Sequence, residues 1–357
     1  MADPRVAEHA KIIVDYSCRV KRDDFVVVMA NPESHDLTVA LASELGRVGA
    51  HFLVIDGDDR IYRAFTLAAD DETLSCFPPQ VLDLVRATDV FVNISDLSSS
   101  NTQEMSDVPP EKLQTAARAA APLSEAMEGK RRCLTLHPTR ALAQDAKMSF
   151  EAYCDFVYSA IIRDWPKFES EMKVLADRLA QAKVVRVVGE DTDITMSVEG
   201  RHPLVSAGTR NLPSGEVFVS PVDTTVEGEV YFDLPAVYQG HEVRGARLTL
   251  RNGLVVQSSA EDGEEFLEML LGVDEGARRL GELGIGMNRG IDRFTKNILF
   301  DEKMGDTVHM AVGRAYKETG GTNESAIHID MIKSMKEGGT IYLDGSPVYE
   351  GGRFVWE

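Results

Sequence analysis

Residues 24–30, Asp-Phe-Val-Val-Val-Met-Ala, form a short run of β-branched residues of the kind found in a buried strand. Similar runs follow at Ala50–Ile55, Asp89–Ile94 and Arg132–His137. Helical patterns lie around and between them, at Val6–Val20, Ser34–Val48, Pro79–Arg86 and Pro109–Ala121. Because strands and helices alternate, the first half of the chain is predicted to be a doubly wound α/β domain with a parallel sheet.

The turn after the first strand argues against a dinucleotide site. A Rossmann domain carries Gly-x-Gly-x-x-Gly at this point, where the glycines let the backbone approach a pyrophosphate. Here the strand runs instead into Asn31-Pro-Glu-Ser. We therefore do not expect this α/β domain to bind a dinucleotide.

The second half of the chain has a different pattern. Helical segments at Ser149–Arg163 and Pro166–Ala182 lead into a strand at Val184–Val188, and one later helix is predicted at Glu261–Leu280. Short strands between Gly, Pro and Asn turns are predicted at Ile194–Val198, Glu216–Val219, Gly228–Phe232, Arg247–Leu250 and Leu254–Ser258. This pattern predicts a β-rich, barrel-like α+β domain. We place the boundary near residue 185, which gives domains 1–185 and 186–357.

The composition disfavours several classes of protein. Of 357 residues, 43% are hydrophobic and 27% are charged, which is typical of a folded globular chain. A net charge of −20 disfavours binding to the phosphates of nucleic acids. No apolar run approaches the roughly 18 residues of a membrane span, and we read no export signal at the charged N-terminus. The 4 scattered cysteines fit a reducing compartment, so a cytoplasmic protein is expected.

His328-Ile-Asp330 is the sharpest candidate for a metal site. On a strand, side chains at i and i+2 project from one face, so an imidazole and a carboxylate would point at the same spot and could hold a divalent ion. The alternative is a surface histidine beside a solvated aspartate. His309 lies among apolar residues and is either a ligand or a core histidine, while Tyr316 is either a hydrogen-bond donor or a packing residue.

Two glutamates stand in apolar, glycine-rich surroundings: Glu216 in the segment 211–218 and Glu282 in the segment 280–288. An ionised carboxylate is costly to bury without a partner, so each glutamate lies either on an exposed turn or next to a cation. Together with the two histidines and Asp330, they are enough ligands for two adjacent divalent metal ions. A set rich in carboxylates suits Zn²⁺, Co²⁺ or Mn²⁺.

Four segments resemble the motifs of the aminopeptidase T family of metallo-aminopeptidases. Asn211-Leu-Pro-Ser-Gly-Glu-Val-Phe218 is similar to the family motif Asn-x-Pro-x-Gly-Glu-Val-Phe, and Leu280–Asn288 is similar to its second glutamate segment. His309–Tyr316 resembles the motif His-x-Ala-x-Gly-x-Ala-Tyr, and Ser325–Asp330 resembles the final His-x-Asp. The resemblance covers essentially the whole chain, with the specific motifs inside residues 189–332.

This resemblance implies an enzyme that removes N-terminal residues from peptides by means of a metal-activated water. It implies an active-site role for Tyr316 and five metal ligands, which are Glu216, Glu282, His309, His328 and Asp330. It also implies a homodimer whose active sites face an enclosed cavity, so that the substrates are short peptides with a free N-terminus. The chain departs from the family in being shorter than typical bacterial members, with a segment between Tyr316 and His328 that looks trimmed.

Two other functions compete with this interpretation. Ring-cleaving iron(II) dioxygenases that act on hydroxypyridines are similar in fold and would use two histidines and one carboxylate. The presence of both Glu216 and Glu282 favours the two-metal hydrolase, because a mononuclear iron site has no use for so many carboxylates. A relative that binds metal or peptide without catalysis is the third possibility.

Overall fold

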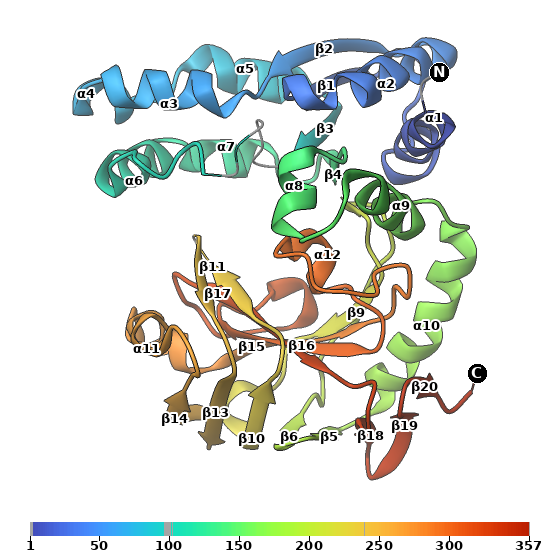
Figure 1. Ribbon diagram of the computed structural model, residues 1–357, viewed down its shortest axis with the longest axis vertical. Coiled ribbons are helices and arrows are strands. Elements are labelled where there is room, and N and C mark those ends of the chain that lie inside the picture. The colour runs from blue at the N-terminus through green and yellow to red at the C-terminus, as the bar shows by residue number, and fades with distance from the viewer. Residues whose placement is uncertain (1–2, 96–100, 102, 239, 357) are drawn as a thin grey trace. The chain divides into compact units, whose positions relative to one another are not determined.

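The computed structural model describes residues 3–95, 101, 103–238 and 240–356 (Figure 1). The chain divides into two compact units. Unit 1 comprises Met1–Ile162 with Gly208–Pro213, and unit 2 comprises Arg163–Ala207 with Ser214–Glu357. The domain boundary that we placed near residue 185 stays a prediction.

Unit 1 contains a five-stranded parallel sheet with the strand order β2-β1-β3-β4-β8. Its strands are β1 (Phe25–Ala30), β2 (His51–Asp56), β3 (Val90–Ser95), β4 (Arg131–Leu136) and β8 (Asn211–Leu212). Val27 and Phe91 on one face are covered by side chains of helices α5 (Pro79–Ala87) and α7 (Ala121–Ala126), while Val26 and Val28 on the opposite face are at most 1% exposed. The middle of β1 is therefore buried on both faces, as the β-branched run predicts.

Helix α1 precedes β1, and the other helices of unit 1 lie in the connections between the strands (Figure 1). They are α1 (Pro4–Lys11), which continues as a π-helical turn at Ile12–Ser17, α2 (His35–Val48), α3 (Asp59–Ala68), α4 (Asp71–Leu74), α5 (Pro79–Ala87), α6 (Pro110–Ala119), α7 (Ala121–Ala126), α8 (Arg140–Asp145) and α9 (Phe150–Ile161). After β1, the Oδ1 atom of Asn31 accepts a hydrogen bond from the backbone N–H of Ser34 at 3.0 Å, and the Ser34 hydroxyl lies 3.1 Å from the backbone nitrogen of Asn31. This capping box uses the backbone groups at the turn where a Rossmann fold would hold a pyrophosphate.

Strand β8 reaches the sheet of unit 1 from far along the chain. Asn211 and Leu212 pair with Leu134 and Thr135 of β4, and the Thr135 hydroxyl donates to the carbonyl of Leu212 at 2.7 Å. The chain leaves unit 2 after Ala207 to form this strand and re-enters unit 2 at Ser214.

Unit 2 contains two antiparallel sheets. The larger has the order β14-β13-β10-β6-β5-β18-β19-β20, the smaller has the order β17-β16-β15-β9-β7, and β11 pairs with β12 alone. The strands of the larger sheet are β5 (Val184–Gly189), β6 (Thr192–Ser197), β10 (Glu227–Phe232), β13 (Ala246–Arg251), β14 (Leu254–Ser259), β18 (Thr340–Leu343), β19 (Ser346–Glu350) and β20 (Arg353–Phe354). The others are β7 (Leu204–Ser206), β9 (Glu216–Val219), β11 (Ala236–Tyr238), β12 (His241–Val243), β15 (Leu280–Gly286), β16 (Thr307–Gly313) and β17 (His328–Ser334).

One hydrophobic core joins these two sheets. It contains Val185 and Leu248 from the larger sheet and Leu283 and Met310 from the smaller. Helices α10 (Trp165–Gln181), α11 (Glu264–Leu271) and α12 (Ile298–Asp301) complete the unit. The predicted fold class, a doubly wound α/β part followed by a β-rich α+β part, is confirmed.

The helix predicted over Glu261–Leu280 is too long. Helix α11 ends at Leu271, and a separate 3₁₀ turn occupies Glu275–Arg278. The side chain of Asp274 accepts a hydrogen bond from the backbone N–H of Ala277 and so begins this new turn. The apolar residues that follow belong to strand β15, and the predicted helix wrongly included its first residue, Leu280.

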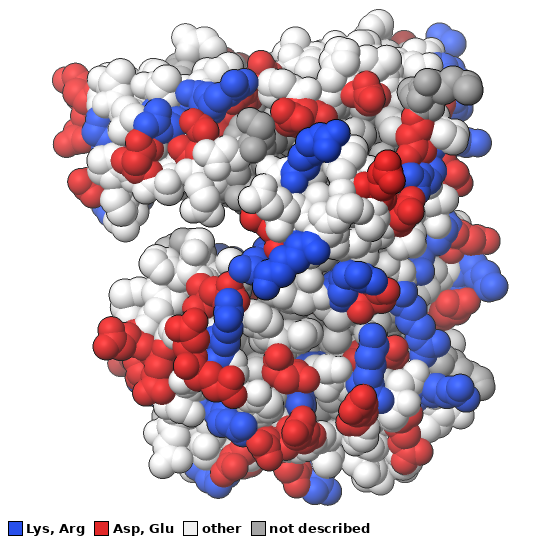
Figure 2. Space-filling view, in the orientation of Figure 1, with Lys and Arg blue, Asp and Glu red and all other residues white. Residues whose placement is uncertain are grey.

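Acidic side chains gather on the surface of unit 2 around α11 and β14 (Figure 2). The exposed acidic residues there are Glu261, Asp262, Glu264, Glu265, Glu268 and Glu275. Within the described residues, none of the helices combines the length and the apolar character needed to cross a membrane.

Candidate metal centre

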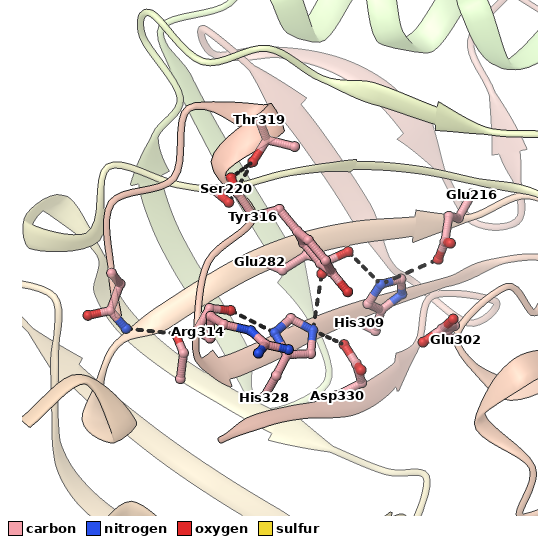
Figure 3. A network of polar contacts seen from close by, with 12 residues as sticks. Glu216, Ser220, Glu282, Glu302, His309, Arg314, Tyr316, Thr319, His328 and Asp330 are labelled. Atoms are coloured by element: carbon pink, nitrogen blue, oxygen red, sulfur yellow. Dashed lines mark hydrogen bonds and ion pairs between the residues drawn. The ribbon is translucent and has the colours of Figure 1, made fainter. Parts of the chain in front are cut away.

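Four neighbouring strands of the smaller sheet carry the five predicted ligands. Glu216 begins β9, Glu282 lies on β15, His309 lies on β16, and His328 and Asp330 lie on β17. The apolar residues that alternate with His309 enter the core between the sheets, so its imidazole projects from the opposite face. The structure brings all five side chains together on that face (Figure 3).

Each histidine lies between two carboxylates. The Nε2 atom of His309 is 3.6 Å from Oε2 of Glu216 and 3.4 Å from Oε1 of Glu282. The Nε2 atom of His328 is 3.3 Å from Oε2 of Glu282 and 3.6 Å from Oδ1 of Asp330. Glu282 therefore belongs to both groups, with one oxygen toward each imidazole (Figure 3).

Both glutamates are buried, which rules out the exposed turns considered as alternatives. Glu216 is 6% exposed and Glu282 is 4% exposed. Among the described residues, Oε2 of Glu216 and Oδ1 of Asp330 are buried without a hydrogen-bond partner. A buried carboxylate oxygen without a hydrogen bond is costly, so these two atoms are suited to binding a cation.

The spacing of these atoms fits divalent metal ions. Ligands held about 2.1 Å from a tetrahedral ion stand about 3.4 Å from one another, close to the separations observed in both groups. Glu282, His309 and Asp330 also offer three ligand atoms that all lie within 4.8 Å of one another. The donor set of imidazole nitrogens and carboxylate oxygens suits Zn²⁺, Co²⁺ or Mn²⁺.

The backbone fixes the orientation of His328. Its Nδ1–H donates to the carbonyl of Arg314 at 2.7 Å, which directs Nε2 toward the carboxylates. A ligating histidine commonly has such a partner on its second nitrogen, because that bond sets the tautomer and the ring plane.

The carboxylates hold both imidazoles in the charged form when no metal is bound. Burial opposes the charge, but Glu282 and Glu216, with a contribution from Asp330, outweigh it and raise the pKa of His309 to about 9. For His328, Asp330 and Glu282 outweigh burial and raise the pKa to about 11. In the absence of metal, protons therefore neutralise part of the negative charge that a divalent ion would neutralise.

Metal binding is expected to release about two protons per chain at pH 7, because both histidines must lose their protons before they can coordinate. Affinity should accordingly rise as the pH is raised toward the pKa values of these histidines. Calorimetry of metal titrations in buffers of different ionisation enthalpy measures the proton count. His51→Gln, a change at an exposed histidine of β2, is the matched control, and affinity that falls with rising pH would contradict the expectation.

Two charged residues near the ligands were missed by sequence reasoning. Lys303 is 0% exposed, and its Nζ atom forms an ion pair with Glu302 and lies 3.7 Å from Oε1 of Glu216. Burial raises the pKa of Glu302 to about 7. The run Asp-Glu-Lys at 301–303 looks like a solvated turn, and its pattern gives no sign that it is buried.

Tyr316 lies beside the ligands, at the end of the segment that follows β16. Its ring makes edge contacts with Phe218 and His328, at centroid distances of 5.5 and 5.1 Å. Its carbonyl accepts a hydrogen bond from the Thr319 hydroxyl at 2.8 Å, and the oxygen of that hydroxyl lies 2.7 Å from the Ser220 hydroxyl, which can donate to it. Burial and the negative charge of Glu282 raise the pKa of the Tyr316 hydroxyl, so it stays protonated and can donate a hydrogen bond.

Glycine makes room for one of the imidazoles. Gly284 of β15 stands opposite His309 of β16, and a Cβ atom at this position would lie 2.0 Å from both Cε1 and Nε2 of the ring. A larger residue at position 284 would therefore overlap the imidazole.

Comparison with known proteins agrees with this geometry. The family model described as thermophilic metalloprotease (M29) matches residues 2–354. Aminopeptidase T of Thermus thermophilus is 28% identical over 97% of this chain and 97% of its own length. Aminopeptidase 2 of Geobacillus stearothermophilus is 26% identical over 98% of this chain and 97% of its length.

A solved structure is similar over the whole chain. Wild-type AmpT from Thermus thermophilus superposes with a TM-score of 0.86 at 26% identity, covering 99% of each chain. These matches confirm the resemblance seen in the motifs and give no support to the ring-cleaving dioxygenase. The chain belongs to the M29 family of thermophilic metalloproteases.

Proposed function

We propose that this protein is a metal-dependent aminopeptidase that removes N-terminal residues from short peptides. The observation that carries the proposal is Glu282, which presents one carboxylate oxygen to each of two imidazoles. The names of its relatives, all aminopeptidases, support the same reaction.

We propose two divalent ions, of zinc, cobalt or manganese, which share Glu282. One would be held by Glu282 with His309 and Glu216, and the other by Glu282 with His328 and Asp330. Such ions lower the pKa of a bound water and polarise a carbonyl group.

The chain's own groups supply the proton transfers and the hydrogen bonds. Glu302, with a pKa of about 7, is suited to accept the proton of the attacking water and to return it to the leaving amine. The protonated hydroxyl of Tyr316 can donate a hydrogen bond to the oxygen that becomes negative in the transition state.

The test compares a free and a blocked N-terminus. After loading with metal, leucyl arylamide and a short peptide with a free amine should be cleaved, and their N-acetylated forms should not. The apolar residues around the ligand motifs favour a first residue such as leucine. Equal cleavage of the blocked and free peptides, or digestion of a folded protein, would overturn the proposal, and oxygen uptake with a hydroxypyridine would favour the dioxygenase.

Tyr316→Phe is expected to lower kcat about 10-fold to 100-fold without reducing metal content, because it removes a hydrogen bond to the transition state but no ligand. Steady-state kinetics together with metal analysis measure both quantities. Tyr62→Phe, at an exposed tyrosine of α3, is the control. Loss of metal from Tyr316→Phe would assign the tyrosine to the metal site instead.

We propose that the protein is a homodimer, and an apolar face of unit 1 supports this. Strand β2 lies at one end of its sheet and exposes Phe52, Leu53 and Val54 by 41–45%, while α3 exposes Ile61 and Phe65 by more than half. An uncovered edge strand with apolar side chains is a common site of pairing between chains. Sedimentation should give twice the chain mass of 39.3 kDa, and Phe52→Lys should lower it to that of one chain.

A cytoplasmic location is also proposed, since all 4 cysteines are free thiols. Fractionation of the source cells tests it, and recovery of the protein outside the cytoplasm would contradict it.

A further inference from the structure

Lys303 carries a charge that is fixed in place beside the proposed ligands. Its backbone N–H bonds to the carbonyl of Phe300 at 2.9 Å, and its carbonyl accepts from the N–H of Asn288 at 3.1 Å. The side chain is 0% exposed, with ion pairs to Glu302 and, at 3.7 Å, to Glu216. The ammonium group is therefore shielded from water and held at a defined distance from a ligand.

Glu216 divides its two oxygens between different partners. Oε1 faces the ammonium group of Lys303 at 3.7 Å, whereas Oε2 faces Nε2 of His309 at 3.6 Å. A divalent ion held between Oε2 and His309 would be close to the ammonium group. Two cations in a buried site repel each other strongly, because little water screens them.

The ligands of the other metal position, His328 and Asp330, have no lysine in direct contact within the described residues. The ion pairs of Lys303 within the described part of the chain are to Glu216 and Glu302, not to His328 or Asp330. Lys303 also acts on the charge of Asp330, but as the weakest of the charges that act on that carboxylate, whereas it lies 3.7 Å from Glu216. The electrostatic environment of the two metal positions is therefore unequal, although each has one imidazole and shares Glu282.

We propose that Lys303 competes with the metal ion bound by Glu216 and makes that position the weaker and more readily exchanged of the two. This inference rests on the two-ion site of the proposed function. Lys303 acts through Glu216 and is a positioning residue. The ion beside His328 stays bound, and the ion beside His309 is gained or lost as the free metal concentration changes.

Titration of the metal-free full-length chain with Co²⁺ or Zn²⁺, followed by calorimetry and by the visible spectrum of Co²⁺, tests the inference. The wild-type chain should bind two ions in separate steps. In Lys303→Met, the dissociation constant of the second step should fall by about tenfold or more, because the repelling charge is gone. General damage to the site would raise this constant, so a tighter second step is specific to competition.

Two control variants test whether the effect on the second binding step comes from the positive charge of Lys303. Lys333→Met removes another buried lysine of unit 2, which is 1% exposed and lies 3.9 Å from Asp233. Alternation along β17 places Lys333 on the face opposite His328 and Asp330, so the second step should not change. Lys303→Arg keeps the positive charge and should keep a weak second step.

Loss of folding in Lys303→Met does not end the test. That variant leaves the half-buried Glu302 without its cation, so the double variant Lys303→Met with Glu302→Gln removes both charges and carries the same expectation. Two equal steps in the wild type, or an unchanged or weaker second step in these variants, would overturn the inference alone. A wild-type chain that binds no divalent ion would overturn the proposed function as well.

Discussion

Gly284→Ala is expected to remove most of the metal and to lower kcat/KM by about 100-fold or more, because it displaces a ligand. The added methyl group would lie 2.0 Å from two atoms of the His309 ring. A contact of 2.0 Å cannot persist, so the buried ring must leave the position from which Nε2 faces the carboxylates. Metal analysis and peptidase kinetics on the purified variant measure the effect.

Gly46→Ala is the matched control for this change. Gly46 lies in α2, and a Cβ atom there would meet nothing within 4 Å. This control should fold and retain metal, since alanine is favoured over glycine inside a helix. Full metal content in Gly284→Ala would show that the His309 ring is not a ligand in the observed position.

Glu282→Gln is expected to have the larger effect, with loss of both ions and a fall in kcat/KM of about 1000-fold or more. Its carboxylate lies 3.4 Å from Nε2 of His309 and 3.3 Å from Nε2 of His328, so both positions lose a ligand in one substitution. Glu216→Gln removes a ligand from only one of the two metal positions and should leave one ion bound. Metal stoichiometry distinguishes the two variants directly.

Glu264→Gln makes the same chemical change on the exposed first turn of α11 and should alter neither metal content nor rate. If Glu282→Gln retained two ions, the carboxylate would not be shared, and the proposed arrangement of the centre would be wrong.

Local sequence patterns predicted those parts of the structure that depend on local periodicity. The β-branched run at 24–30 predicted a buried parallel strand because a sheet covered on both faces requires apolar residues at every position. The spacing of His328 and Asp330 predicted one shared face because a strand repeats every two residues. The sequence does not decide whether His309 is a metal ligand or a core residue. Alternation along a strand gives the face on which a side chain lies but not the residues that lie beside it.

Other features depend on contacts that no local pattern records. The order β17-β16-β15-β9 places Glu216 beside His309, although 93 positions separate them in the sequence. Glu302 and Lys303 follow a short helix and have the composition of a surface turn, yet Lys303 is fully buried. The burial of Lys303 follows from packing against residues distant in the chain, and a single sequence does not contain that information.

The path of the chain through β8 constrains how such genes can recombine. Unit 1 depends on residues 208–213, which are encoded inside the stretch for unit 2 and end three codons before Glu216. A hybrid gene that joins residues 1–162 of one relative to the remainder of another would insert a foreign strand beside β4. Viable hybrids should therefore inherit 208–213 from the parent of the first 162 residues, and a crossover library sorted for soluble protein would reveal this linkage.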